Sequence, residues 1–164
     1  MTEVDIVLNW LTIIAFCLST YTFIFQLISH RKKIEIQLCH MFEWGNPQTI
    51  YVAYLEIINK SRLPISITRI SMEQNGKLLS FEQLPQEIVS GTRGNGEPYT
   101  AFSEPFPISL QGLDAKSGLF LAIPKNHDFA VAPHSAIKLH IATNRGKLQS
   151  KVEVSGFSDH LKLL

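Results

Sequence analysis

The chain has 164 residues, and its 15 basic and 14 acidic side chains give a net charge of +1. A charge this close to zero produces no overall field that attracts nucleic acid, so we expect no nucleic-acid partner. The two cysteines, Cys17 and Cys39, lie in an apolar segment and in a strand-like segment, where a bridge between them is geometrically implausible. The sequence therefore lacks the disulfide framework that is typical of small secreted domains.

The first predicted element covers residues 6–29, which contain no charged side chain. At about 1.5 Å per residue, the apolar run Ile6–Ile28 spans roughly 34 Å, enough to cross a hydrocarbon core of about 30 Å. A secretory signal peptide has a basic start, a shorter apolar run and a small-x-small cleavage site, whereas this chain starts with acidic residues. We predict a retained transmembrane helix after a short external tail at residues 1–5. The alternative is a buried core helix.

The flanks of this segment predict its orientation. Arg31, Lys32 and Lys33 belong to a basic stop at residues 30–33, and no Lys or Arg precedes the helix. Because basic flanks stay on the cytoplasmic side, we expect a single-pass protein of the cell membrane with its N-terminus outside and its β domain in the cytoplasm. The same three side chains are candidates for contact with lipid headgroups. The alternative is that these basic residues serve only as a topology signal and helix stop, which explains their presence without any lipid contact.

A stripe of small and polar residues follows one side of the predicted helix. Its members are Asn9, Thr12, Ala15, Ser19, Thr22 and Gln26. Small and hydroxyl residues let two helices approach closely in lipid, and amides are costly when they face hydrocarbon. The stripe predicts a partner helix, which belongs either to another membrane protein or to a second copy of this chain. The alternative is that the hydroxyls bond to carbonyls of their own helix and the spacing is chance.

From residue 34 the apolar residues alternate with a period of two, which is typical of half-buried strands. A clear face consists of Tyr51, Ala53, Leu55 and Ile57. The alternation slips near Thr68-Arg69, where we predict a β-bulge. We expect a β-sandwich over residues 34–155 and a C-terminal tail over 156–164.

Turn signals divide this region into strands. Gln74-Asn75-Gly76 and Asn144-Arg145-Gly146 each predict a hairpin, and Ser90–Pro98 predicts a glycine-rich loop. Two prolines confine any strand over Ala101–Leu110 to an edge, and Leu119–Ile123 is a short apolar run. The sequence shows no amphipathic helix of normal length after residue 33. We therefore predict seven to nine strands in an immunoglobulin-like or fibronectin-like topology, although the Cys-Trp-Cys hallmark is missing.

The layout resembles that of uncharacterised small bacterial or phage proteins in which a membrane helix and a basic stop precede a β-sandwich. The resemblance rests on the helix with Arg31-Lys32-Lys33, on the stretch Ile57–Ile67 and on the terminal hairpin. It covers most of the chain and implies no particular activity.

No pattern in the sequence predicts an enzyme, a metal site or a cofactor. None of the six histidines has a second His or Cys at a zinc-ligand spacing, and His127-Asp128 has the composition of an ordinary turn. The glycines near residue 94 are followed by neither the Lys-Ser/Thr end nor the helix of a phosphate-binding loop. The arginines are dispersed along the β region rather than clustered as in a nucleic-acid footprint. They are Arg62, Arg69, Arg93 and Arg145.

We therefore expect a non-enzymatic accessory or adaptor protein. Its helix would associate with another membrane protein, and its sandwich would bind a protein through loops such as Ser90–Pro98 and Lys125–Pro133. One alternative is a structural homo-oligomer at the membrane. Another is a sensor that binds a ligand between its sheets.

Overall fold

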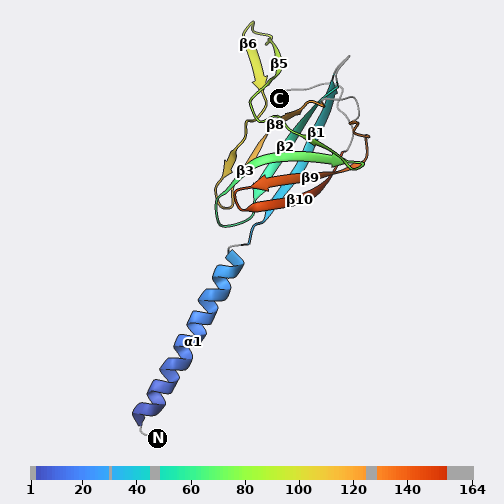
Figure 1. Ribbon diagram of the computed structural model, residues 1–164. Coiled ribbons are helices and arrows are strands. Elements are labelled where there is room, and N and C mark those ends of the chain that lie inside the picture. The colour runs from blue at the N-terminus through green and yellow to red at the C-terminus, as the bar shows by residue number, and fades with distance from the viewer. Residues whose placement is uncertain (1–2, 30, 45–48, 125–128, 155–164) are drawn as a thin grey trace.

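The computed structural model describes residues 3–29, 31–44, 49–124 and 129–154. Within the helix, it describes the side chains of residues 7–27. The helix α1 (Glu3–Ser29) extends away from a β domain (Figure 1). All its described side chains are exposed, and none of the apolar stretch Val7–Leu27 is buried. The core-helix alternative is therefore wrong. The helix is long and apolar enough to be either a membrane span or a signal sequence.

The described residues of the β domain form ten strands, more than the seven to nine expected, and all the pairings among them are antiparallel. The first sheet has the order β1-β2-β8, and the second has the order β10-β9-β3-β4, with β7 also paired to β3. A separate hairpin is formed by β5 and β6. The strands are β1 Ile34–Trp44, β2 Ile50–Asn59, β3 Ile65–Gln74, β4 Lys77–Ser80, β5 Glu87–Thr92, β6 Pro98–Phe102, β7 Ile108–Leu110, β8 Ala115–Ala122, β9 Ala136–Thr143 and β10 Gly146–Glu153.

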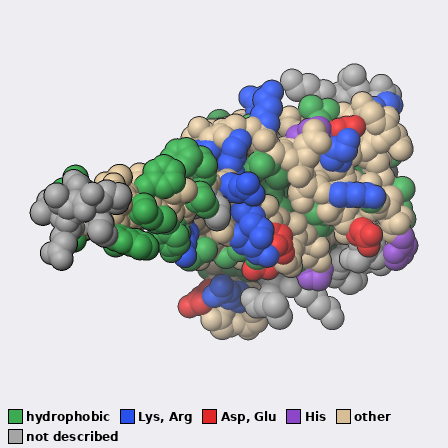
Figure 2. Space-filling view, turned by 90° about the horizontal axis from the view of Figure 1, so that it is seen from below, with side chains coloured by type: hydrophobic (Ala, Val, Ile, Leu, Met, Phe, Trp, Pro, Cys, Tyr) green, Lys and Arg blue, Asp and Glu red, His purple; other side chains and the backbone are tan. Residues whose placement is uncertain are grey.

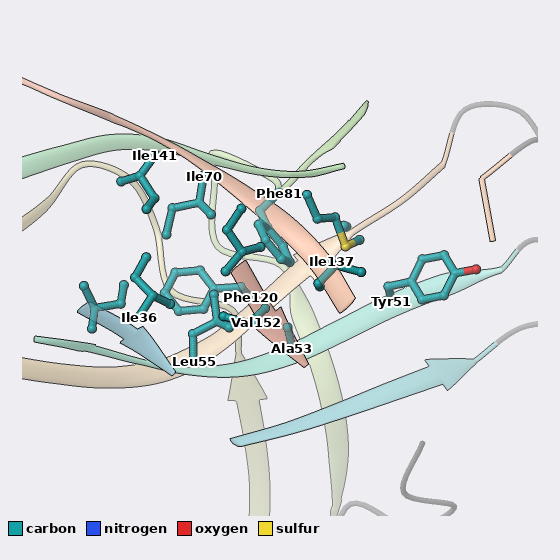
Figure 3. Close-up of a cluster of buried hydrophobic side chains, with 14 of the residues drawn as sticks. Ile36, Tyr51, Ala53, Leu55, Ile70, Phe81, Phe120, Ile137, Ile141 and Val152 are labelled. Atoms are coloured by element: carbon teal, nitrogen blue, oxygen red, sulfur yellow. The ribbon is translucent and has the colours of Figure 1, made fainter. Parts of the chain in front are cut away.

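One hydrophobic core lies between the first and second sheets, and Figure 3 shows its side chains pointing toward one another. The four residues predicted to form a face of β2 are all buried there, with exposures of 0–1%. Alternation explains the core, because every second residue of a strand points to the same side. Aromatic residues fill its centre, where the ring of Phe120 lies 5.9 Å from Phe81 and 5.6 Å from Phe106, measured between centroids.

The predicted bulge and hairpins are confirmed. The pairing of β3 with β9 shifts between Ile67 and Arg69, so the extra residue lies at the predicted position. Between β3 and β4, Asn75 and Gly76 have φ values of 53° and 76°, as a two-residue turn that follows the twist of the strands requires. The final hairpin pairs β9 with β10 around Gly146, whose φ is 109°.

The loop predicted over Ser90–Pro98 is partly wrong, because the ends of this segment belong to the β5–β6 hairpin. The register pairs Gly91 with Tyr99, and the Tyr99 ring lies 3.0 Å from where a Cβ at Gly91 would stand. An aromatic ring that covers a glycine compensates for its missing side chain. The edge prediction is confirmed, since β7 follows the second proline and pairs only with β3 among the described strands.

Candidate functional site

The helix presents the predicted stripe with all six side chains exposed. The hydroxyl of Thr12 donates a hydrogen bond to the carbonyl of Leu8 at 2.9 Å, and that of Thr22 donates to Leu18 at 2.8 Å. Two of the stripe's side chains therefore make the internal bonds of the alternative interpretation. The two amides of the stripe, which are the most costly groups to place in lipid, remain predicted contacts for a partner helix.

The predicted basic stop lies between α1 and β1, where Arg31, Lys32 and Lys33 are exposed. The carbonyl of Lys33 accepts a hydrogen bond from the backbone N–H of Lys60 at 2.7 Å. The stop is thereby joined to the β2–β3 connection. The Nζ of Lys32 lies 2.5 Å from where a Cβ on the glycine of the β9–β10 turn would stand. Chain segments far apart in sequence thus meet beside the end of the helix.

We define the helix-proximal end of the β domain as residues 31–35, 60–64, 111–114 and 144–147. These segments hold seven Lys or Arg and two acidic residues, against 15 and 14 in the whole chain. Figure 2 shows Lys and Arg side chains gathered where the helix meets the domain. The four arginines of the β region are dispersed along the sequence, but folding brings Arg62 and Arg145 to this end because the connections after β2 and β9 both lie there.

Asn59 holds two connections of the helix-proximal end together. It is fully buried, and its Nδ2 donates to the carbonyls of Leu63 at 2.9 Å and Gln111 at 2.7 Å. Its Oδ1 accepts from the backbone N–H of Ser61 at 3.0 Å and from the Ser61 hydroxyl at 2.6 Å. The β7–β8 connection approaches closely here, since a Cβ on Gly112 would stand 2.1 Å from a carbonyl oxygen of the β2–β3 connection. Hydrogen bonds and close packing therefore join the two connections.

The β5–β6 hairpin projects from the domain at the end opposite the helix (Figure 1). Its base is closed by Ser103, which is buried, donates its N–H to the Gln86 carbonyl and accepts from the Gln86 N–H through its hydroxyl. Large apolar side chains are exposed near that base, with exposures of 70% for Leu84 and 56% for Phe102. The predicted contact loop Ser90–Pro98 contains the hairpin's tip. The other predicted contact loop, at 125–133, lies partly outside the described residues.

A charged cluster that sequence analysis did not anticipate lies on the outer face of the second sheet. A carboxylate oxygen of Glu73 contacts the Nε2 of His140 and lies 3.7 Å from the Nζ of Lys138. The Nδ1 of His140 lies 3.4 Å from the Gln149 side-chain nitrogen. Glu73, His140 and Gln149 line an open groove of about 920 Å³. The strand alternation indicates their shared face, but only the pairing of β3 with β9 brings them together.

The charged cluster joins a carboxylate to an imidazole and an ammonium group. Among the described residues, no three His, Cys, Asp or Glu side chains are grouped to hold a metal ion. The hydrogen bond from His140 lowers the pKa of Glu73, while the partial burial of the carboxylate acts in the opposite direction. The predicted turn at His127-Asp128 lies outside the described residues.

The lowered pKa of Glu73 leads us to expect that the stability of the β domain depends on pH. Because its pKa in the folded chain is below the ordinary value of 4.5, the carboxylate stabilises the fold above about pH 4.5. That stabilisation is lost as the pH falls through the lowered pKa. We expect the melting temperature of Glu73→Gln to lie below that of the unsubstituted chain at pH 6, and the gap to close toward pH 3. Thermal melts across this range measure it, and a gap that does not change with pH would contradict the prediction.

Comparisons with known proteins identify no relative. No protein-family model matches the chain, and no curated protein matches it. A solved structure that is similar in part is that of the Pseudomonas fluorescens alkylpurine DNA glycosylase AlkC bound to DNA containing an abasic site analog. The TM-score is 0.32 at 10% sequence identity, with 73% of this chain and 30% of the glycosylase chain covered. A similarity at that level carries no argument about fold or activity.

Proposed function

We propose that this chain is a single-pass membrane protein that acts as a non-enzymatic accessory or adaptor. The observation that carries the proposal is the wholly exposed apolar surface of α1. Large apolar side chains in Val7–Leu27 are 44–72% exposed, a surface that soluble proteins bury. Lipid or another helix would cover it. The β domain, held at one end of this anchor, would present surfaces to a protein partner.

The strand order supports an immunoglobulin-like topology for the domain. In constant-type immunoglobulin domains, strands A, B and E lie in one sheet and C, F and G in the other. Matching β1, β2 and β8 to A, B and E, and β3, β9 and β10 to C, F and G, gives the same neighbours. Strand β4 then stands at the C′ position of variable-type domains, and the segment containing the β5–β6 hairpin replaces strand D.

This assignment favours the β5–β6 hairpin as the surface for a protein partner. The connections equivalent to the B–C and F–G loops, which bind antigen in antibodies, lie at the helix-proximal end. A membrane around α1 would restrict access to them. The hairpin projects from the opposite end and exposes Leu84 and Phe102. Large apolar side chains exposed near one element are a feature of protein contact surfaces.

The basic stop favours the orientation with the N-terminus outside and the β domain in the cytoplasm. An epitope tag placed before residue 1 tests both orientation and retention of the helix. The tag should remain on the membrane-bound full-length chain and react with antibody outside intact cells, while external protease leaves the β domain whole. A mature chain without the tag would identify a cleaved signal sequence and contradict the proposal.

The accessory role is tested by purification of the C-terminally tagged chain from its native membrane in a gentle detergent, followed by mass spectrometry. A reproducible, different membrane protein at fixed stoichiometry supports the proposal. Recovery of this chain alone as a defined multimer would replace the accessory role with the homo-oligomer. The sensor alternative predicts a ligand-dependent rise in melting temperature, which thermal melts would measure.

The double substitution Ser19→Leu/Gln26→Leu is expected to weaken the complex recovered by that purification. It removes an amide and a small side chain from the stripe and leaves the helix apolar. Interhelical hydrogen bonds in membranes are worth about 0.6–2 kcal/mol each, so we expect a loss of roughly three- to thirtyfold in association. The matched control, Cys17→Leu/Ile24→Leu, changes the opposite side of the helix, because each position lies two residues before a substituted stripe residue. Equal complex recovery from both variants would remove the stripe as a contact surface.

A further inference from the structure

Basic side chains at the helix-proximal end are arranged around the emerging helix rather than on one strand. Arg31, Arg62 and Lys147 are exposed there and come from three separate segments. Lys60 is paired with Glu35, and the hydrogen bond from Lys60 lowers the pKa of that carboxyl. Since the end has seven cations and two acids, its local charge is strongly positive although the chain is nearly neutral. A surface of this charge fits an anionic partner.

A contact between the β domain and α1 shows which turn of the helix lies beside the basic side chains. The guanidinium carbon of Arg62 lies 5.3 Å from the centroid of the Phe25 ring, within the range of a cation–π interaction. Phe25 belongs to the last turn of the apolar stretch Val7–Leu27. If α1 spans a bilayer, Arg62 is therefore at the depth of the lipid headgroups, where arginines commonly place their charge.

An exposed leucine accompanies the cations. Leu113, in the β7–β8 connection, is 72% exposed and has a φ of 60°, a backbone conformation that side chains other than glycine rarely adopt. Its N–H donates to the carbonyl of Ser61 at 2.9 Å, which ties it to the connection that carries Arg62. A strained, ordered backbone that presents an apolar side chain to solvent is a feature of contact surfaces.

We propose that the helix-proximal end docks on an anionic bilayer surface, with Arg31, Arg62 and Lys147 on acidic headgroups and Leu113 in the interfacial layer. The inference rests on the proposed membrane anchor and adds a second attachment to it. Apolar insertion beside basic side chains is the combination by which proteins bind anionic membranes. The domain would thus be held upright on the membrane, with the β5–β6 hairpin directed away from it.

A fluorescent reporter at residue 113 tests this contact in the full chain. Leu113→Cys is placed in a background with Cys17→Ala and Cys39→Ala, labelled with an environment-sensitive dye and reconstituted into vesicles that contain headgroup spin-labelled lipid. We expect quenching in equal parts phosphatidylcholine and phosphatidylserine, and much less in phosphatidylcholine alone or at high salt. A label at Asn95→Cys, in the hairpin tip, should stay unquenched. Equal quenching in both lipids, or equal quenching of both labels, would overturn the proposal.

Removal of two charges identifies the residues responsible. Arg62→Gln/Lys147→Gln should shift the ratio of docked to undocked domain about 30-fold toward the undocked state, at about 1 kcal/mol per charge. The matched control Lys77→Gln/Lys151→Gln removes two exposed charges elsewhere and should leave quenching unchanged. Flotation of the vesicles after alkaline extraction distinguishes failure of the membrane anchor from failure of the docking. A chain that does not float refutes the anchor, whereas one that floats without quenching at residue 113 refutes only the docking.

Discussion

Replacement of Phe120 by alanine is expected to destabilise the β domain by about 3–5 kcal/mol. Phe120 is 2% exposed and contacts the rings of Phe81 and Phe106. Phe81 directly follows β4 and Phe106 lies just before β7, and both strands are paired with β3. Because this pairing holds both phenylalanines in place, we expect them not to fill the cavity left by the ring. Denaturant unfolding of the purified chain in detergent, followed by tryptophan fluorescence, measures the loss. Since small domains are stable by only about 5–15 kcal/mol, this substitution should remove a large share of the free energy of unfolding.

The control for this prediction is Phe102→Ala in β6. Its side chain is 56% exposed, so the same chemical change removes little buried surface. We expect a loss within about 0.5 kcal/mol, as for most surface substitutions. Similar losses for the two variants would mean that Phe120 does not occupy a packed core. A large loss for Phe102→Ala alone would assign the core contact to the hairpin instead.

The elements that sequence analysis identified correctly are those determined by local signals. The turn at Asn75-Gly76 needs two residues that tolerate positive φ, and the chain supplies them between two alternating runs. The bulge near Thr68 was visible because one extra residue reverses which side chains face the core. The β5–β6 hairpin was missed because glycines there favour a loop, while the compensating Tyr99 ring acts across the strands.

The features of the candidate site that sequence analysis missed depend on contacts between distant segments. Glu73 and His140 are 67 residues apart and meet only through the pairing of β3 with β9. The charge of the helix-proximal end is likewise invisible along the chain, because Arg62 and Lys147 become neighbours of the helix only when the connections after β2 and β9 lie at one end of the domain. The predicted stripe on α1 concerns a partner outside the chain, so it stays a prediction.

Asn59→Ala is expected to destabilise the domain by about 2–4 kcal/mol, because several buried polar groups lose partners at once. The Gln111 carbonyl would lose a donor and the Ser61 N–H would lose its acceptor, while the Leu63 carbonyl and the Ser61 hydroxyl, 3.0 Å apart, would each lose one of two partners. Asn59→Asp should be at least as damaging at neutral pH, since a buried carboxylate would face two carbonyl oxygens. Denaturant unfolding at matched pH gives both values.

Asn144→Ala is the matched control, because Asn144 is also an asparagine beside a turn but is exposed. Its Oδ1 accepts one hydrogen bond, from the Ser66 N–H at 3.0 Å, so we expect a loss of only about 0.5–1.5 kcal/mol. An Asn59→Ala loss no larger than this would contradict the network. If the network holds, a folded Asn59 variant should also show weaker quenching at residue 113, because the same four bonds position the two connections that present Arg62 and Leu113 to the membrane.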